Sequence, residues 1–380
     1  MNFERISIEK LTFFLVIFLI YFSAIFRYYF GVVFLLVPLF LLVLCATTII
    51  LHIGIPNMEL RKTDVTFSFI LVLYLFIAVF IGTTTDTLIV LVIPLLALSV
   101  RLVSFCNIQY IFKVLVIIQA SLMFYEVITL SFIYTVQIGD TIFDEKIMGG
   151  NIGIFRAKGL FEGPTVASIF LITAALFIGS QKKWLLCLLV LSLMTGGRTP
   201  VIIIGAIGAY LHVKNMIYSD NMLERITPII ALLFGIIWLT QFDMDYLVFD
   251  RLSQTTDFSA SSNSARLSYW ISSIGFFSNY DLIHLLFGNM GAYRLEFDNS
   301  TESGWIQILV DLGISGLLFF LLPFMKALWS NFNANALFFF SIMILSNFVF
   351  TFSFGVIGAF SYWLIIFCFE DICKASVSTK

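Results

Sequence analysis

Long apolar runs dominate this chain and decide its fold class. An apolar run of about 20 residues can cross a bilayer as a helix, which satisfies its own backbone hydrogen bonds there. The pattern predicts an all-α polytopic membrane protein with about 12 transmembrane helices, forming a single integral membrane domain over residues 1–380. The runs lie at 11–26, 28–51, 65–82, 87–100, 111–135, 164–180, 184–194, 199–213, 226–240, 304–325, 333–351 and 354–369.

The composition excludes the main alternatives to a membrane protein. Of 380 residues, 60% are hydrophobic and 12% are charged, whereas about a quarter of a soluble domain is charged. A soluble enzyme, a coiled coil, a disordered chain and an outer-membrane barrel are therefore excluded. The net charge of -2 gives no reason to expect nucleic acid as a partner. None of the five cysteines lies in the long polar intervals, so we expect neither a disulfide framework nor a cysteine metal site.

The cations predict the orientation. With the N-terminus in the cytoplasm, 13 Lys and Arg residues fall on the cytoplasmic side and 8 on the outer side, as the positive-inside rule requires. Arginine dominates the outer set, and its planar fork suits phosphate or carboxylate. An anionic ligand on the outer face is one interpretation, and pairing with outer acids is the other. The outer cations are Arg27, Lys146, Arg156, Lys158, Arg198, Arg251, Arg266 and Arg294.

Two predicted outer loops, at 136–163 and 241–303, hold most of the polar residues. The second is expected to contain an amphipathic helix at about 264–278, because polar and aromatic residues recur there at three- and four-residue spacing. Arg266 and Trp270 belong to this helix. Trp270 is either an interfacial anchor or a platform for a sugar ring. The chemistry is expected at this outer membrane–water boundary.

The segment Gly196-Gly197-Arg198-Thr199-Pro200 marks a second candidate site. Proline suits the first turn of a helix, and glycine lets the backbone approach a ligand closely. A helix N-terminus beside an arginine can bind phosphate. The alternative is a tight turn with an arginine that extends toward the water.

Two acids mark the span at 304–325. Glu302 lies just before it and Asp311 lies within it. Glu302 is either a base or a carboxylate that stabilises the start of a helix. Acids within a membrane span are usually functional or paired.

Three motifs in this order resemble the O-antigen polymerase and ligase superfamily (Wzy and its ligase relative) of bacterial inner-membrane glycosyltransferases. The resemblance covers roughly residues 195–318. The first motif is Thr-Gly-Gly-Arg at 195–198. The second is the late outer loop with Arg266 and Trp270, which ends in the turn Gly288-Asn289-Met290-Gly291. The third is the helix Trp-Ile-Gln-Ile-Leu-Val-Asp-Leu-Gly-Ile-Ser-Gly-Leu at 305–317.

One departure from the family pattern favours a polymerase over a ligase. The ligases often carry a histidine about eleven residues before the first glycine of the last motif, and this chain has Glu302 there. The resemblance implies a GT-C-like polymerase that joins undecaprenyl-pyrophosphate-linked oligosaccharide repeat units on the periplasmic face of the inner membrane and releases undecaprenyl pyrophosphate. It also suggests a chain-length regulator and a flippase as partners, besides membrane lipids.

The expected catalytic residues are Glu302 as the base and Arg198 and Arg266 as stabilisers of the pyrophosphate. Scattered outer acids predict no metal and no other cofactor. An O-antigen ligase that acts on lipid A–core, and a flippase or other transporter for lipid-linked oligosaccharides, remain the alternative functions. The expected substrate-binding residues are Arg251, Arg156, Lys158, Arg294, Tyr269, Trp270 and Trp305.

Overall fold

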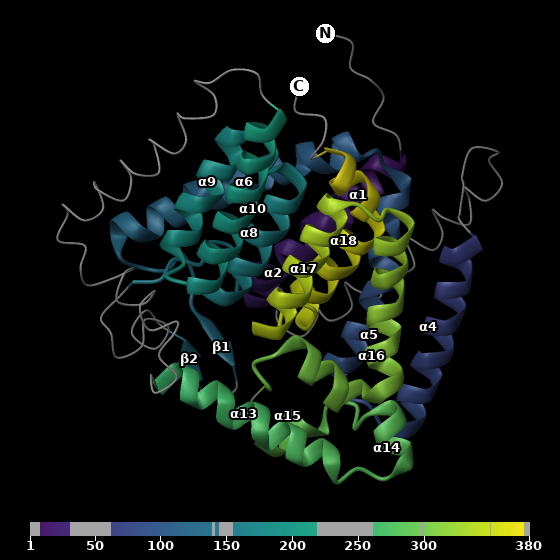
Figure 1. Cartoon of the computed structure of the whole chain (residues 1–380). Helices are drawn as coiled ribbons and strands as arrows, with labels where there is room; N and C mark the ends of the chain where they lie inside the picture. Colours follow the sequence, from purple (N-terminus) through teal and green to yellow (C-terminus); the bar gives the residue numbers. More distant parts are fainter. Residues whose placement is uncertain are drawn as a thin grey trace. The chain divides into compact units, whose positions relative to one another are not determined.

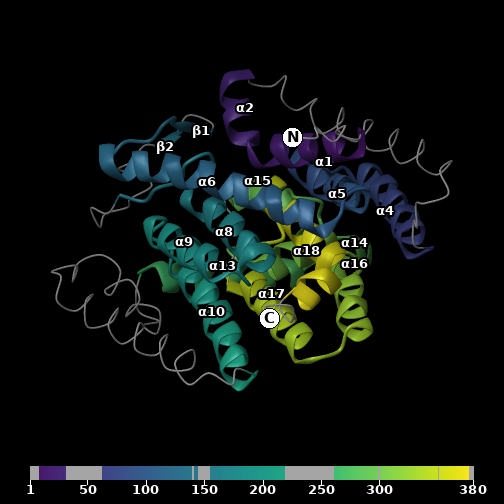
Figure 2. The same cartoon turned by 90° about the horizontal axis from the view of Figure 1, so that it is seen from above.

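The computed structural model describes residues 8–30, 62–138, 141–143, 155–218, 261–297, 300–349 and 351–375. These residues form helices joined by short connections, apart from one hairpin (Figures 1 and 2). The helical class predicted from the sequence is therefore confirmed. The chain divides into two compact units. Unit 1 comprises residues 1–111 and 266–374, and unit 2 comprises residues 112–265 and 375–380.

Unit 1 is built around helices from both ends of the chain. Tyr21 near the N-terminus forms a buried hydrogen bond of 3.0 Å with Ser361 near the C-terminus. The Trp363 ring packs on Phe67 and Phe320, at centroid distances of 4.8 and 5.2 Å. Its elements are α1 (Ile8–Tyr21), α2 (Ser23–Phe30), α4 (Lys62–Ile81), α5 (Thr85–Ala97), the 3₁₀ helix η2 (Leu98–Leu102), the start of α6 (Phe105–Thr129), α13 (Ser261–Ser278) from Arg266 onward, α14 (Leu282–Phe287), α15 (Ala292–Phe297), α16 (Gly304–Ser330), α17 (Ala334–Val349) and α18 (Gly355–Ala375).

Unit 2 holds a three-helix cluster in which α8 (Pro164–Ile178), α9 (Lys182–Met194) and α10 (Arg198–Tyr218) each pack against the other two (Figure 2). Pro164 begins α8 after Gly163, in the first-turn position where its missing N–H has no cost. The rest of α6 belongs to this unit. A short antiparallel hairpin of β1 (Val136–Ile138) and β2 (Thr141–Phe143) departs from a purely helical fold.

The described helices have membrane character. Three of them, α6, α16 and α18, are long enough and apolar enough to cross a bilayer. Large apolar side chains also stay exposed on the helix surfaces, including Phe80 (93% exposed) on α4 and Ile128 (79% exposed) on α6. A helix that is apolar on its exposed side as well as its buried side belongs in lipid. The count of twelve spans and the GT-C-like arrangement stay predictions.

Several helices differ in their bounds from the predicted runs. The run at 111–135 corresponds to α6, which begins at Phe105 and ends at Thr129, where Leu130 adopts a left-handed backbone conformation (φ 50°). The N-terminal run breaks at Phe22 into α1 and α2. The predicted run at 226–240, most of the run at 28–51 and residues 241–260 of the large loop lie outside the described residues.

Candidate functional site

Glu302 and Arg266, two of the three predicted catalytic residues, lie close together in unit 1. The Arg266 Nε is 3.8 Å from the Glu302 Oε2, and the two side chains are 34% and 38% exposed. Arg266 comes from α13, which includes the predicted helix at 264–278. Glu302 lies in the connection that precedes α16. The pair is thus half open to solvent and accessible to a ligand.

The backbone at Glu302 is held in an unusual conformation. Its φ is 58°, in the left-handed region that non-glycine residues seldom adopt. Such a conformation costs about 1–3 kcal/mol and persists only where the surroundings impose it. Thr301 on one side and Ser303 on the other are fully buried and supply that constraint.

Hydrogen bonds fix this turn from both sides. The Thr301 N–H donates to the Gln307 Oε1 (2.9 Å), and the Thr301 hydroxyl donates to the Ser303 carbonyl (2.8 Å). Gly304 abuts Asn347, because a Cβ at Gly304 would lie 2.1 Å from the Asn347 Oδ1. The same Oδ1 accepts from the Ser353 N–H (2.8 Å). Glu302 is therefore presented by a rigid backbone.

A buried polar chain leads from this turn into α16. Gln307, which holds Thr301, also donates through its Nε2 to the Asp311 Oδ2 (2.8 Å). The Arg294 Nε lies 3.9 Å from the same Asp311 oxygen, and the Arg294 guanidinium stacks over the Phe354 ring at 4.6 Å. Asp311 and Gln307 are fully buried. The prediction that an acid within this span is functional or paired is met by an ion pair with Arg294.

The turn at 288–291 docks onto a break in α16. Gly313 has non-helical angles (φ 67°, ψ −169°), which frees carbonyls of the preceding turn. The Asn289 N–H donates to the Val310 carbonyl (3.1 Å), and the Met290 N–H donates to the Asp311 carbonyl (2.9 Å). A Cβ at Gly288 would lie 2.2 Å from the Asp311 carbonyl oxygen. Only glycine permits this approach, so two of the motifs noted in the sequence form one structural unit.

The short helix α14 leads into this turn, and Figure 1 shows it at the same end of α16 as α13 and α15. Asp281 caps α14 by accepting from the His284 N–H (2.8 Å), and this bond together with the His284 ring lowers the pKa of the Asp281 carboxyl. Burial raises the pKa of the neighbouring Tyr280, and the charges of Asp311 and Glu296 add to the rise. Its hydroxyl donates to the Val310 carbonyl (3.1 Å).

The predicted aromatic residues have different surroundings. Trp270 packs edge-on against Phe348 at 5.1 Å, and its buried indole N–H has no hydrogen-bond partner among the described residues. Trp305 donates its indole N–H to the Ile344 carbonyl (3.0 Å) and so joins α16 to α17. Tyr269 is half-buried beside Trp270 on α13. Their roles in substrate binding stay predictions.

In unit 2, the predicted residues Arg156 and Arg198 border one turn. Arg198 begins α10, directly after Gly196 and Gly197. The Arg156 Nε donates to the Thr195 carbonyl (2.9 Å), and its Cγ would lie 3.0 Å from a Cβ at Gly196. Gly196 has a φ of 60°, which glycine adopts without cost. The two arginines thus lie near one helix N-terminus, where both their charge and the helix dipole favour an anion.

Lys158 has a different environment from Arg156. It is fully buried, with its Nζ 3.4 Å from the centroid of the Tyr134 ring and 5.1 Å from that of Phe132. Its backbone N–H donates to the Glu126 Oε2 (2.8 Å), as does that of Gly159 (2.7 Å). These contacts anchor the loop that carries Arg156, so the observed contacts of Lys158 are structural. Its predicted contact with substrate stays a prediction.

Sequence reasoning missed the polar residues that hold these sites. Gln307, Asn347 and Glu126 all lie within apolar helices, and each is fully buried. The sequence feature that could have identified them is a polar side chain inside a predicted span. The predicted residue Arg251 lies outside the described residues. The part of the chain that the structure describes contains no group of three or more His, Cys, Asp or Glu that could hold a metal ion.

Comparison of the chain with protein-family models, curated proteins and solved structures finds no match.

Proposed function

We propose that this protein is a membrane glycosyltransferase that joins undecaprenyl-pyrophosphate-linked oligosaccharide repeat units, as an O-antigen polymerase does. The observation that carries the proposal is the pair Arg266–Glu302. A carboxylate on a rigid turn lies beside a guanidinium, at the start of a helix long enough to cross a bilayer. A reaction between a sugar hydroxyl and a lipid pyrophosphate needs a base and a cation at a membrane boundary.

In the proposed reaction, Glu302 accepts the proton of the acceptor sugar hydroxyl. The hydroxyl oxygen forms a bond to the anomeric carbon of the donor chain. The bond from that carbon to the pyrophosphate oxygen breaks, and its electron pair leaves with undecaprenyl pyrophosphate. Arg266 then stabilises the negative charge that develops on the leaving group. The half-open position of both side chains gives lipid-linked substrates access.

The neighbouring residues support this chemistry. The buried chain Arg294–Asp311–Gln307–Thr301 holds the base in place, and a fixed base lowers the cost of reaching the reactive geometry. In unit 2, the turn at Arg198 is proposed as a second pyrophosphate-binding element, together with Arg156.

Two other functions compete with this proposal. An O-antigen ligase would transfer the glycan to lipid A–core. This chain, however, has Glu302 at the position where the ligases often carry a histidine. A flippase would carry cations inside its spans along a central cavity. Among the described residues, the paired acids and arginines instead gather at the start of α16 and in the helices next to it.

The decisive experiment incubates the purified protein with a lipid-linked repeat unit and resolves the products as a ladder. Glu302→Gln keeps the size of the side chain but cannot accept a proton, so the polymerisation rate should fall about 10²–10⁴-fold. Glu302→Asp should retain part of the activity. Glu296→Gln is the matched control, since Glu296 is an exposed carboxylate on the nearby helix α15.

Binding of the lipid-linked unit, measured separately, should be unchanged in Glu302→Gln. A normal ladder from Glu302→Gln would reduce Glu302 to a structural carboxylate. A wild-type protein that makes no ladder but transfers glycan to lipid A–core would identify a ligase. Transport without any covalent product would identify a flippase.

A further inference from the structure

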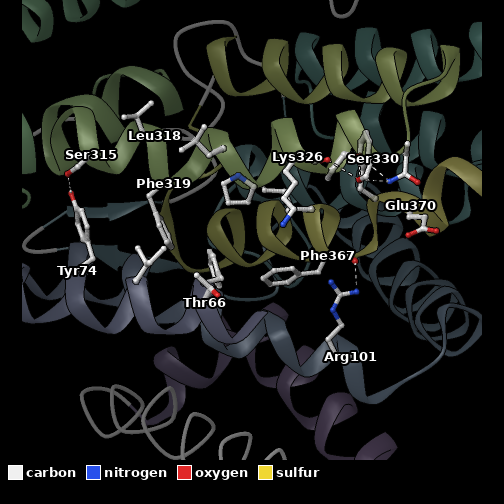
Figure 3. A pocket seen from close by; sticks show the side chains of 18 residues that line it. Thr66, Tyr74, Arg101, Ser315, Leu318, Phe319, Lys326, Ser330, Phe367 and Glu370 are labelled. Atoms are coloured by element: carbon white, nitrogen blue, oxygen red, sulfur yellow. Dashed lines mark hydrogen bonds between the residues drawn. The ribbon is translucent and has the colours of Figure 1, made fainter. Parts of the chain in front are cut away.

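Unit 1 contains a groove that the catalytic proposal does not use. Its volume is about 660 Å³, within the range of about 300–1,000 Å³ that is typical of small-molecule sites. Helices α4, α16 and α18 form its walls (Figure 3). The apolar part of the lining includes Phe67, Ile70, Leu318, Phe319 and Leu322.

The groove is open along its apolar walls. Ile70 is 46% exposed, Leu318 is 47% exposed and Leu322 is 59% exposed. These residues belong to α4 and to the membrane-crossing helix α16, so a lipid chain is the occupant that matches their surface. The stretch of α16 from Ser315 to Ser330 is about 22 Å long at 1.5 Å per residue. That length exceeds one leaflet of a hydrocarbon core about 30 Å thick.

The two ends of the groove differ in charge. At one end, the Ser315 hydroxyl donates to the Leu286 carbonyl (2.6 Å), and the Tyr74 hydroxyl donates to the Leu312 carbonyl. Neither group is charged, and both hydrogen bonds are to the protein backbone. This end therefore suits the terminus of an acyl chain.

The other end carries two cations. Figure 3 shows Lys326 and Arg101 reaching from opposite walls toward Phe367. Arg101 donates to the Phe367 carbonyl (3.0 Å), and its guanidinium lies over the Phe367 ring, 5.6 Å from the centroid. Two acids of α18 also lie at this end. Glu370 is paired with Lys374 at 2.5 Å, and Asp371 follows it on the helix. Among the described residues of this end, the cations Arg101, Lys326 and Lys374 outnumber the two acids.

The sequence predicts that Arg101, Lys326 and Lys374 face the cytoplasm. The cytoplasmic leaflet is the one whose anionic lipids attract basic residues. We propose that this groove binds one anionic phospholipid, with an acyl chain along α4 and α16 and its phosphate between Arg101 and Lys326. This site is independent of the proposed polymerase reaction, because none of the residues assigned to that reaction lines the groove.

The test counts lipids bound to the delipidated, full-length protein by native mass spectrometry. The probes are phosphatidylglycerol, phosphatidylcholine with the same acyl chains, and glycerol phosphate, which carries the anionic head alone. Phosphatidylglycerol should bind at one copy per chain and more tightly than phosphatidylcholine. Glycerol phosphate should neither bind nor compete, because the apolar walls supply much of the affinity.

Three variants separate charge from shape. Each basic residue near an anionic lipid contributes about fivefold in affinity, so Lys326→Gln should weaken phosphatidylglycerol binding about fivefold and Arg101→Gln/Lys326→Gln about 30-fold. Ala327→Phe fills the groove and should weaken both phospholipids alike. Lys183→Gln is the control, because Lys183 is an exposed lysine at the start of α9 that does not line the groove.

Several results would overturn the proposal. Equal affinities for the two phospholipids would show ordinary annular lipid. An equal loss in Lys183→Gln and Lys326→Gln would show general electrostatic attraction. Competition by glycerol phosphate would show a site for free phosphate esters, and displacement by a polyprenyl phosphate at lower concentration would assign the groove to the lipid-linked substrate. Lys326→Gln alone decides the question if the double variant does not fold, since Lys326 is exposed.

Discussion

Replacing Gly288 by alanine should destabilise the junction between α14 and α16 by more than the addition of one methyl group usually does. The new Cβ would lie 2.2 Å from the Asp311 carbonyl oxygen. The turn must then move away, which removes the bonds from Asn289 and Met290 to α16. Two hydrogen bonds are worth about 2 kcal/mol. The backbone angles of Gly288 (φ 77°, ψ −178°) lie in a region essentially confined to glycine, which costs alanine about 1–3 kcal/mol. The free energy of unfolding should fall by about 3–5 kcal/mol.

Two matched glycines separate these contributions. Gly355 has nearly the same φ of 76°, but nothing lies within 4 Å of its added Cβ, so Gly355→Ala should cost only about 1–2 kcal/mol. Gly275 lies within helix α13 with open space around it, so Gly275→Ala should stabilise the protein by up to about 1 kcal/mol. Detergent-denaturant unfolding followed by tryptophan fluorescence measures all three. If Gly288→Ala costs no more than Gly355→Ala, the close approach of this turn to α16 is not a stabilising contact.

Further predictions concern charge, metal and orientation. Arg266→Lys and Arg198→Lys keep the charge but lose the planar fork, and each should cost about 2–4 kcal/mol of transition-state stabilisation in the ladder assay; near-normal ladders would make both arginines structural. The pKa of Asp281 is lowered in the folded state, so its stabilisation is present above about pH 3.9 and is lost as the pH falls further. The stability difference between wild type and Asp281→Asn should therefore shrink in acid, and a constant difference would contradict the capping role. Polymerisation should survive EDTA; a loss restored by Mg²⁺ would show a metal requirement. A single cysteine probe at Glu296 should label from outside the cell and one at Lys183 only from the cytoplasm, whereas the opposite labelling would reverse the predicted orientation.

The hydrophobic pattern predicts most of the described helices because lipid imposes the same requirement on every span. Runs such as 164–180 and 333–351 correspond to α8 and α17 within a few residues. The break in α16 at Gly313 is different. Glycine is common in membrane helices, and nothing local shows that the freed carbonyls of Val310 and Asp311 have partners at residues 289 and 290. Only the tertiary contact identifies the break.

The sequence likewise predicted only part of the candidate site. Arginine and glutamate at a span boundary were recognisable from the sequence, and the structure brings Arg266 and Glu302 together. The residues that hold the turn at Glu302 were not recognisable, because Gln307 and Asn347 accept hydrogen bonds from the backbone N–H groups of Thr301 and Ser353. A hydrogen bond to a backbone atom places no demand on the type of the residue it holds. Such pairs leave no pattern in a single sequence.

The carboxylate of Glu126 imposes an order of events on the biogenesis of unit 2. It lies in α6, whereas two of its hydrogen-bond donors, at Lys158 and Gly159, are 32 and 33 residues further along the chain. At a synthesis rate of about 5–20 residues per second, those donors leave the ribosome about 2–7 s after Glu126 does. During that interval α6 carries an acid that these donors do not yet hold, in the last turn of a helix long enough to cross the bilayer. The helix must therefore keep this end at the water interface until residues 155–161 have followed it, and only then can the loop close over the acid.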